Sequence, residues 1–274
     1  MDEFAPGFEE DEPRRSEFIR ELTLRQLARR QEPRTGDAAV CDETGIPRTL
    51  IRFWHEPRNV PDDVQHCMAT WGPLRREGFV FRMFDDTSAA EYIRSWYGQR
   101  ELSAFARCRH PAMRSDFLRL CFVLAEGGLY VDVDDVLSGP GWQELFRDDR
   151  LKLQPLCYDF ALQGMVDGSE LRRADMPTRD RIFYVNNNPI AAPPGHPVLH
   201  RALVRATRRL LESDVPEIQS TTGPGNLTAA LAAHAAESQD MDFELLLDWE
   251  ATAAPRWDLE YRGDDRNWRN MDSS

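Results

Sequence analysis

The clearest hydrophobic pattern in the chain begins at Met113. From Met113 to Ala125 apolar residues recur at helical spacing, which predicts a helix with one buried face. Gly127 and Gly128 follow, and they predict a C-cap and a tight turn because glycine accepts backbone angles that a Cβ resists. The next residues, 129–133, are Leu-Tyr-Val-Asp-Val, which is typical of a buried strand. The pattern therefore predicts a helix, a sharp turn and a core strand in direct succession.

Three carboxylates, Asp132, Asp134 and Asp135, lie where this predicted strand ends. Unpaired buried carboxylates are costly, so we expect them to hold a cation or a ligand. If the extended geometry persists, Asp132 and Asp134 face one pocket while Val133 faces the core. Hard oxygen ligands suit Mg²⁺ or Mn²⁺, whereas the spacing does not match an EF-hand calcium loop. An isolated Asp-x-Asp is more often a solvated turn, and its place after an apolar strand is what favours a ligand site.

The rest of the pattern predicts an α/β domain. Strands are expected within 46–55 and 78–84, and helices within 62–71 and 87–97, which indicates a largely parallel sheet. Further strands are expected at 151–160 and 181–185, and the asparagines at 186–188 are interpreted as a turn that either lines a site or only reverses the chain. Ligands bind beyond the carboxyl ends of parallel strands, so Trp54, at the end of the first strand, could converge with the acids.

The chain ahead of this domain has a different character. Residues 1–45 are interpreted as an acidic N-terminal extension with one helix, at 16–30, and residues 46–274 as one domain. The helix could dock on a membrane or a partner, or it could pack on its own domain, which is the simpler alternative.

Composition narrows the class of protein. The formal net charge of −13 argues against a nucleic-acid partner, which needs a basic face. No apolar run approaches the roughly 20 residues that span a bilayer. The N-terminus lacks the features of a signal peptide, so a cytoplasmic location is expected. The five cysteines form no Cys-x-x-Cys pair, which disfavours a zinc site or a disulfide framework.

Asp116 and Arg119 add candidate chemistry to the predicted helix. They are three residues apart and therefore share a helix face. One interpretation is a surface ion pair of little energetic value. The other is a buried pair that recognises sugar hydroxyls, which the apolar surroundings of the helix favour.

These residues together resemble a known family. The runs Arg-Ser-Asp-Phe-Leu-Arg at 114–119 and Gly-Gly-Leu-Tyr-Val-Asp-Val-Asp at 127–134 are similar to the signature of retaining glycosyltransferases with a DXD-containing sugar-binding region. This glycosyltransferase family 32-like group includes capsular polysaccharide transferases and initiating α-1,6-mannosyltransferases, and more distantly the clostridial glucosylating toxins. The opening strand, Ile-Pro-Arg-Thr-Leu-Ile-Arg-Phe-Trp at 46–54, also resembles the family, and weaker similarity extends to about residue 230.

The resemblance implies an α/β fold of the GT-A type, Rossmann-like and nucleotide-sugar-binding, with a mixed, mainly parallel sheet flanked by helices. It implies a metal-dependent retaining glycosyltransferase that moves a hexose from a nucleoside-diphosphate sugar to a hydroxyl acceptor. A UDP-sugar is favoured and GDP-mannose is possible; the acceptor is a small-molecule natural product or a glycan. The implied cofactor is Mn²⁺ (or Mg²⁺). The alternative is a catalytically silent sugar-nucleotide or carbohydrate-binding module.

The resemblance also implies roles for individual residues. Trp54 would stack on the donor base, and Asp132 and Asp134 would be the catalytic pair, the first on donor hydroxyls and the second on the metal. Asp135 could share the metal role. Further residues expected to bind the donor are Arg114, Asp116, Arg119 and, as a lid with Trp257 as its rival, Trp268; Asp265 is the expected C-terminal metal ligand.

Overall fold

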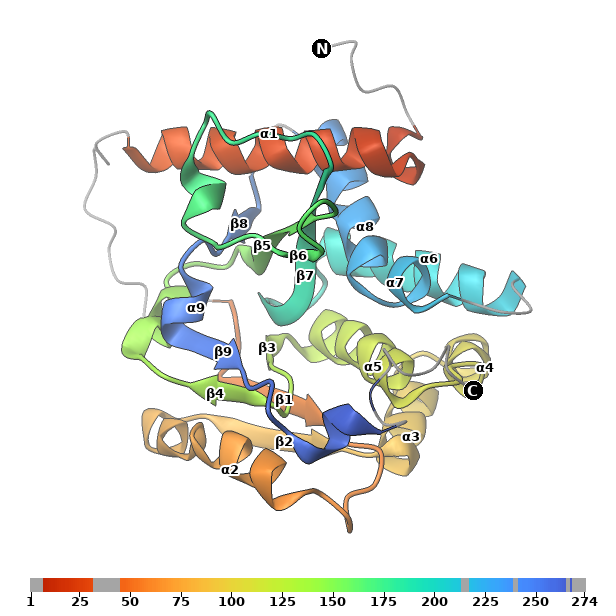
Figure 1. The fold of residues 1–274 in the computed structure, drawn as a ribbon. Helices are drawn as coiled ribbons and strands as arrows, with labels where there is room; N and C mark the ends of the chain where they lie inside the picture. The colour runs from red at the N-terminus through yellow and green to blue at the C-terminus, as the bar shows by residue number, and fades with distance from the viewer. Residues whose placement is uncertain (1–6, 32–44, 213–216, 239–240, 265–266, 268–274) are drawn as a thin grey trace.

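The computed structural model describes residues 7–31, 45–212, 217–238, 241–264 and 267 (Figure 1). Within these residues a seven-stranded sheet has the order β2-β1-β3-β7-β5-β6, with β8 also paired to β5. Its strands are β1 (Thr49–Phe53), β2 (Val80–Phe84), β3 (Gly128–Tyr130), β5 (Leu151–Asp159), β6 (Gly164–Met165), β7 (Arg181–Ala192) and β8 (Phe243–Leu245).

Most strands of this sheet run in one direction. β1 pairs in parallel with β2 and β3, and β5 pairs in parallel with β8. β7 is antiparallel to both β3 and β5, and β6 is antiparallel to β5. Five of the seven strands therefore share one direction, and β7 and β6 oppose it. The expected α/β fold class, with a mixed and mainly parallel sheet flanked by helices, is confirmed.

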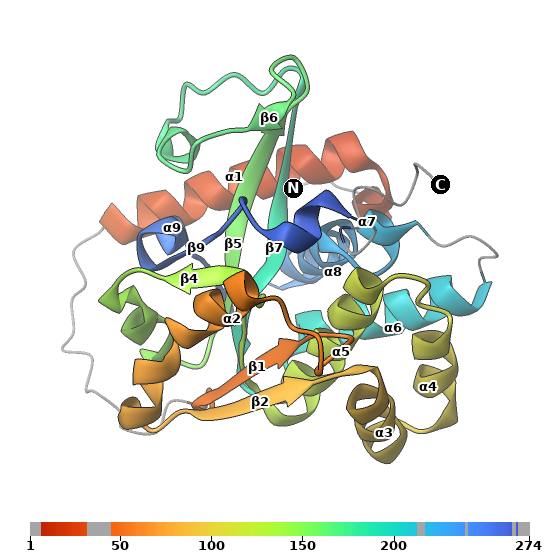
Figure 2. The ribbon, with the colours of Figure 1, turned by 60° about the horizontal axis from the view of Figure 1, so that its bottom comes forward.

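Helices and small elements cover the two faces of the sheet (Figures 1 and 2). A second, two-stranded sheet joins β4 (Asp135–Leu137) to β9 (Ala253–Pro255). The helices are α1 (Glu12–Gln31), α2 (Asp62–Ala69), α3 (Asp86–Trp96), α4 (Gln99–Ala106), α5 (Pro111–Glu126), α6 (Pro197–Glu212), α7 (Ile218–Thr221), α8 (Pro224–Glu237) and α9 (Trp249–Thr252). Among the helices described, none combines the length and the apolar composition needed to cross a bilayer.

Alternation along β1 explains why the sheet separates two cores. Ile51 packs into a large cluster that includes residues of α3 to α6, α8 and α1, whereas Leu50 packs into a second cluster with Trp71 and Trp142. Both side chains are almost fully buried. Strands with both faces covered are apolar at successive positions, as the sequence of β1 indicated.

Helix α1 packs on the rest of the described chain. Ile19 is fully buried, and the Ser16 Oγ accepts a hydrogen bond from the backbone N of Phe183 at 2.8 Å. Farther along, Gln26 Oε1 accepts from the backbone N of Leu245 at 2.9 Å. Of the two alternatives for the segment 16–30, the structure shows packing against β7, β8 and α8.

Two local expectations were wrong. The strand after the Gly-Gly turn ends at Tyr130, so Asp132 and Asp134 lie in a turn between β3 and β4, and Asp135 is the first residue of β4. The asparagines at 186–188 lie inside β7 and do not form a turn. Both differences place polar side chains beside the end of β3.

Candidate active site

Helix α5 and strand β3 carry the first half of the site, and two glycines join them. The helix begins with a cap, in which His110 Nδ1 accepts from the backbone N of Ala112 at 3.0 Å. At its end Gly127 and Gly128 have φ of 70° and 115°. A Cβ on Gly128 would lie 2.7 Å from the carbonyl oxygen of Thr49. The missing side chain therefore lets β3 enter the sheet directly beside β1.

Arg119 is the centre of the buried part of the site. Its guanidinium stacks 4.1 Å above the ring of Tyr130. Burial by itself lowers the pKa of Arg119, but Tyr130 and Asp132 raise it above its ordinary value, so the guanidinium stays charged. Its Nη1 donates to the carbonyl oxygen of Asn187 at 2.7 Å; its Nη2 donates to Asp132 Oδ1 at 3.0 Å and to Ser115 Oγ and Tyr130 Oη, each at 3.1 Å.

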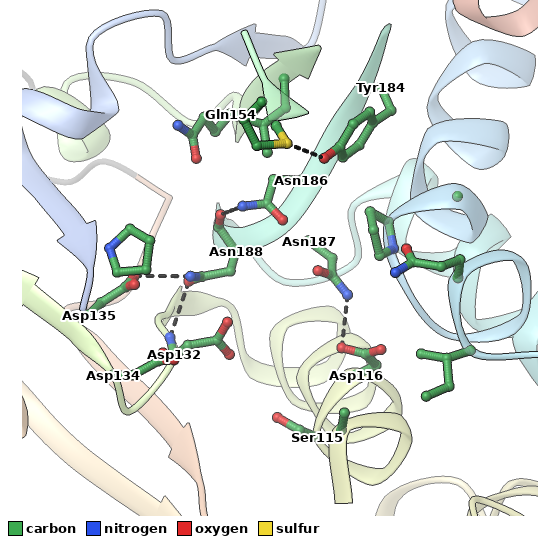
Figure 3. Close-up of a pocket in the computed structure, with 18 of the residues that line it drawn as sticks. Ser115, Asp116, Asp132, Asp134, Asp135, Gln154, Tyr184, Asn186, Asn187 and Asn188 are labelled. Atoms are coloured by element: carbon green, nitrogen blue, oxygen red, sulfur yellow. Dashed lines mark hydrogen bonds between the residues drawn. The ribbon is translucent and has the colours of Figure 1, made fainter. Parts of the chain in front are cut away.

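Asp116 forms a buried pair with Arg119, at 3.1 Å, and the two side chains are 8% and 5% exposed. The surface ion-pair interpretation is therefore wrong. Asp116 also accepts from Asn187 Nδ2 at 2.8 Å (Figure 3). It accepts a further hydrogen bond from Thr222 Oγ1 at 3.3 Å. Burial raises the pKa of Asp116 to about 6, against the opposing effect of Arg119.

Asp132 is the most exposed of the aspartates that line the cavity. Its Oδ1 accepts from Arg119 Nη2 at 3.0 Å and from Tyr130 Oη at 2.9 Å, and its side chain is 35% exposed. Its Oδ2 accepts no hydrogen bond from the part of the chain that the structure describes. The backbone N of Asp135 donates to the carbonyl oxygen of Asp132 at 3.3 Å, which closes a turn. The alternation of an extended strand therefore does not apply to the Asp-x-Asp.

Asp134 is buried and faces the C-terminal segment. Its Oδ2 accepts from Tyr261 Oη at 2.5 Å and forms an ion pair with Arg262 Nη2. Tyr261 and Arg262 lie in the short 3₁₀-helix Glu260–Gly263. Burial raises the pKa of Asp134, and the charge of Asp132 raises it further.

Asp135 is 1% exposed and only partly satisfied. Its Oδ2 accepts from Asn188 Nδ2 at 2.9 Å, while its buried Oδ1 has no hydrogen-bond partner among the described residues. Burial raises the pKa of Asp135 well above its ordinary value, as do Asp132 and Asp134. Burial and mutual repulsion therefore disfavour the ionisation of Asp134 and Asp135 together with Asp132.

These acids fit a divalent cation. Carboxylate oxygens are the ligands that Mg²⁺ and Mn²⁺ prefer, and the unpartnered Oδ1 of Asp135 is a buried acceptor that a cation would satisfy. Within the described ranges, no group of three His, Cys, Asp or Glu side chains is placed to hold a metal. A cation with one or two protein carboxylates takes its remaining ligands from substrate phosphates and water. Asp265, the expected C-terminal ligand, lies outside the described residues.

The three tryptophans that were expected to contact the donor differ in their positions. Trp54 lines the cavity, but its ring is 6% exposed and meets the edge of Tyr261 at a centroid distance of 5.4 Å. Trp257 also lines the cavity, is 56% exposed, and carries the guanidinium of Arg262 over its ring at 4.3 Å. Trp268 lies outside the described residues.

Arg114 is the predicted donor-binding residue that the structure does not bring to the acids. Its Nε forms an ion pair with Asp86 Oδ1 at 2.7 Å, and its Nη1 donates to the carbonyl oxygen of Cys108 at 3.2 Å. It is not among the residues that line the cavity. In this arrangement Arg114 joins α5 to the start of α3.

Several contacts at the site were not predicted from the sequence. Asn187 and Asn188 bond Asp116 and Asp135, and the available signal was a run of asparagines in a segment that is otherwise strand-like. Tyr261 and Arg262 contact Asp134 from the other end of the chain, and no spacing or motif connects them with it.

The acids, Arg119, Asn187, Asn188, Tyr261 and Arg262 border one cavity of about 1090 Å³. Figure 3 shows Asp116, Asp132 and Asp134 on one side of it, and Gln154, Tyr184 and Asn186 on the other. A pocket for one small ligand is about 300–1,000 Å³. The cavity therefore has room for a ligand at the acids and for a second group beside it.

Comparison with known proteins agrees with this geometry. Residues 61–150 match the sequence family described as "Glycosyltransferase sugar-binding region containing DXD motif", a range that contains Asp116, Arg119 and the three acids. The chain is 24% identical over 196 residues to the initiation-specific alpha-1,6-mannosyltransferase of Saccharomyces cerevisiae. That alignment covers 61% of this chain and 40% of the yeast protein, so the chain matches less than half of the length of this relative.

A solved structure, described as PaToxG Glycosyltransferase, is similar with a TM-score of 0.47 and 13% identity, over 95% of each chain. The sequence match, by contrast, falls on the residues that form the site. Together with the mannosyltransferase relative, it shows that this chain is similar to glycosyltransferases whose sugar-binding region contains a DXD motif.

Proposed function

We propose that the protein transfers a hexose from a nucleoside-diphosphate sugar to a hydroxyl group of an acceptor, with a divalent cation, Mn²⁺ or Mg²⁺, bound at the acids. The observation that carries this proposal is the position of the Asp132 carboxylate at the cavity. It is held by Arg119 and Tyr130 through one carboxylate oxygen, while its other oxygen faces a cavity large enough for a sugar nucleotide.

The buried pair gives this carboxylate its orientation. Arg119 bonds Asp132 and Asp116 at the same time, so the position of Asp132 is set by α5 and not by solvent. A carboxylate fixed in this way can accept hydrogen bonds from sugar or ribose hydroxyls without reorganising. Asp116, which is paired with Arg119 and also lines the cavity, would contact the donor from the same helix.

Asp134 and Asp135 are the residues that would hold the cation. When bound, the cation would neutralise charge on the departing diphosphate. The carboxylates themselves would keep this cation beside an otherwise acidic wall, where an anionic donor would be repelled without it. Arg262 lies on Asp134 in the same place and would have to move, at least partly, as the cation binds.

The finer features of the reaction rest on the family resemblance. We propose retention of configuration by attack on the same face as the leaving group, with the diphosphate helping to accept the proton of the acceptor hydroxyl. A UDP-sugar is the favoured donor and GDP-mannose the competing one. The acceptor would be a small molecule or a glycan.

Donor hydrolysis tests the proposal. Sugar nucleotides would be incubated with the protein and Mn²⁺, and free sugar and nucleotide measured. We expect hydrolysis of at least one donor by the natural protein and a loss of about 100-fold or more in Asp134→Asn, since the cation site contributes electrostatic stabilisation of that order. Asp258→Asn, an exposed acid on the same C-terminal segment, is the matched control and should keep full activity. Equal hydrolysis by Asp134→Asn would contradict the role of the acids.

A silent binding module is the second candidate, and the Arg262–Asp134 ion pair favours it because the pair occupies a cation ligand. Thermal-shift measurements with the same panel of sugar nucleotides separate the two functions. Stabilisation by a sugar nucleotide without hydrolysis or transfer would support the module. Stabilisation together with Mn²⁺-dependent hydrolysis would support the enzyme.

A further inference from the structure

The cavity continues beyond the acids along one face of the sheet. Besides the acids, its lining includes side chains of β5, β6 and β7, which lie on the far side of the cavity in Figure 3. These strands form the hairpin that projects at the top of Figure 2. The proposed donor chemistry uses only the part near Asp132, so this second part of the cavity is available to another ligand or another part of one.

Strand periodicity creates the exposed face. On β7, Phe183 is buried in the core, whereas Ile182 and Tyr184 point the other way and are half-buried. On β5, Leu156 and Tyr158 behave in the same way. The register pairs Leu156 with Tyr184 and Tyr158 with Ile182, so the four side chains form one continuous surface.

Strand β6 extends this surface. Met165 pairs with Tyr158, is 49% exposed, and its Sδ accepts from Tyr184 Oη at 3.5 Å. We call the surface formed by these residues the hairpin face: Leu156, Tyr158, Met165, Ile182 and Tyr184. All five line the cavity. An apolar surface left open inside a cavity is a mark of ligand binding.

The hairpin face is continuous with the acids through β7. Asn186 follows Tyr184 on the same side of the strand, and Asn187 and Asn188 then bond Asp116 and Asp135. A molecule lying along β7 would therefore meet apolar side chains first, amides next and carboxylates last. That order suits a molecule with an apolar body and a hydroxyl at one end.

The chemistry of the hairpin face distinguishes it from a subsite for a sugar chain. Three of its residues are Leu, Ile and Met, which offer no hydrogen bonds to hydroxyl groups beyond the weak acceptor sulfur. Polar groups border this part of the cavity as well, namely Gln154, Gln163, Asn186 and the hydroxyls of Tyr158 and Tyr184. Against Leu156, Met165 and Ile182, however, an oligosaccharide would leave hydroxyls unpaired, whereas an apolar group would gain by leaving water.

We propose that the hairpin face binds an apolar portion of the acceptor, aliphatic or aromatic, and places its hydroxyl beside Asp132. The acceptor is thereby an alcohol or a glycoside with a hydrophobic body, and not an unmodified polar oligosaccharide. This inference rests on the proposed transfer reaction for the role of the bound molecule, while the binding of an apolar group can be measured without it.

Binding of hexyl and methyl β-D-glucopyranoside, followed by titration calorimetry and saturation-transfer NMR, tests the proposal. The two probes share a sugar and differ only in the apolar chain. We expect the hexyl glycoside to bind about tenfold tighter or more, as burial of two or three methylene groups would give. Phenyl β-D-glucopyranoside as a third probe distinguishes an aromatic from an aliphatic preference.

Substitutions locate the effect. Leu156→Asn and Met165→Asn should each remove most of the preference for the hexyl chain, and Met165 is exposed enough that its replacement leaves the fold intact. Leu162→Asn is the matched control, because Leu162 lies on the same hairpin, is 77% exposed and does not line the cavity. Circular dichroism and the melting temperature check that every variant is folded.

The outcomes separate this inference from the proposed function. If sugar nucleotides are hydrolysed but the two glycosides bind equally, or neither binds at millimolar concentration, the hairpin face is not an acceptor site and the transfer reaction stands. If the hexyl preference is present and depends on Leu156 and Met165, but no donor is bound or hydrolysed, the apolar site stands and the transfer reaction does not. Preference and hydrolysis together support both.

Discussion

Arg262 and Asp134 form a buried ion pair between Nη2 and Oδ2, although 127 residues separate them in the sequence. The pair joins the C-terminal segment to the turn after β3, and the carboxylate involved is the one expected to bind the cation. A guanidinium and a metal ion compete for such an oxygen, because each is a cation that binds a carboxylate.

Replacement of Arg262 should therefore strengthen cation binding. In Arg262→Met the Asp134 carboxylate loses its competing charge, and we expect Mn²⁺ to bind about tenfold tighter or more, which corresponds to about 1.4 kcal/mol. Titration followed by electron paramagnetic resonance measures free Mn²⁺ directly. Arg256→Met is the control, since Arg256 pairs with the exposed Asp258 on the same segment. Weaker Mn²⁺ binding in Arg262→Met would mean that Arg262 helps to assemble the site.

The raised pKa of Asp116 predicts a pH dependence of stability. Its pKa is about 6 in the folded protein and 3.8 when unperturbed, so between these values the folded state binds more protons than the unfolded state. The stability contributed by this group is present below pH 3.8 and is lost as the pH rises through 6. The limit of the effect is about 3 kcal/mol, from roughly two pKa units.

Asp116→Asn isolates this contribution. Asparagine resembles the protonated carboxyl, so its effect on the free energy of unfolding should be small at pH 4.5. At pH 7 the natural protein carries the cost of a buried charge, which the variant lacks. The free energy of unfolding of the variant, relative to that of the natural protein, should therefore be higher at pH 7 than at pH 4.5. Urea unfolding of both proteins at the two pH values gives the difference, and an unchanged difference would show that the Asp116 carboxyl titrates normally.

Gly128 should tolerate no side chain. In Gly128→Ala the new Cβ would lie 2.7 Å from the Thr49 carbonyl oxygen, at a φ of 115° that alanine rarely adopts. We expect a loss of about 2–4 kcal/mol in the free energy of unfolding. Gly72→Ala is the control, because a Cβ there meets no atom within 4 Å. Comparable stability of the two variants would show that β3 can move away from β1.

Helix α1 should contribute to the stability of the whole fold. Ile19 is fully buried in the core, so Ile19→Ala should lower the free energy of unfolding by about 2–4 kcal/mol. Glu17→Ala, on the exposed side of the same helix, should change the free energy of unfolding by less than about 0.5 kcal/mol. Chemical denaturation tests both. A small effect of Ile19→Ala would indicate that residues 1–45 are an extension that the domain does not need.

The sequence predicted the elements that depend on local pattern. The helix of 111–126, the Gly-Gly turn and the alternation of strands and helices from 46 to 97 follow from periodicity and from backbone freedom, which nearby residues determine. The relation between Asp116 and Arg119 also follows from helical spacing. Their burial, which distinguishes a ligand-site pair from a surface ion pair, was indicated by the apolar residues around them.

Contacts between distant segments were not predictable in this way. The Asp134–Arg262 pair has no signature, because neither spacing nor composition indicates that η5 (Glu260–Gly263) returns to the end of β3. The Asn run at 186–188 suggested a turn because asparagine is common in turns and rare in strands. In β7, Asn187 and Asn188 donate to Asp116 and Asp135, which only the folded chain brings near.

Strand β7 sets the distance between the hairpin face and the acids. Tyr184, in the hairpin face, and Asn188, beside Asp135, lie on one strand, but the pairing of β7 with β5 is irregular between them. The register moves from Val185 opposite Pro155 to Ile190 opposite Leu153, so β7 advances less there than a regular strand does. A regular strand advances about 3.4 Å per residue, which sets an upper limit of about 14 Å between the two regions. If one acceptor occupies both regions, the protein selects acceptors by the distance between their apolar group and their hydroxyl. A hydroxyl too close to the apolar group would not reach the acids, and one attached through a much longer linker would extend beyond them.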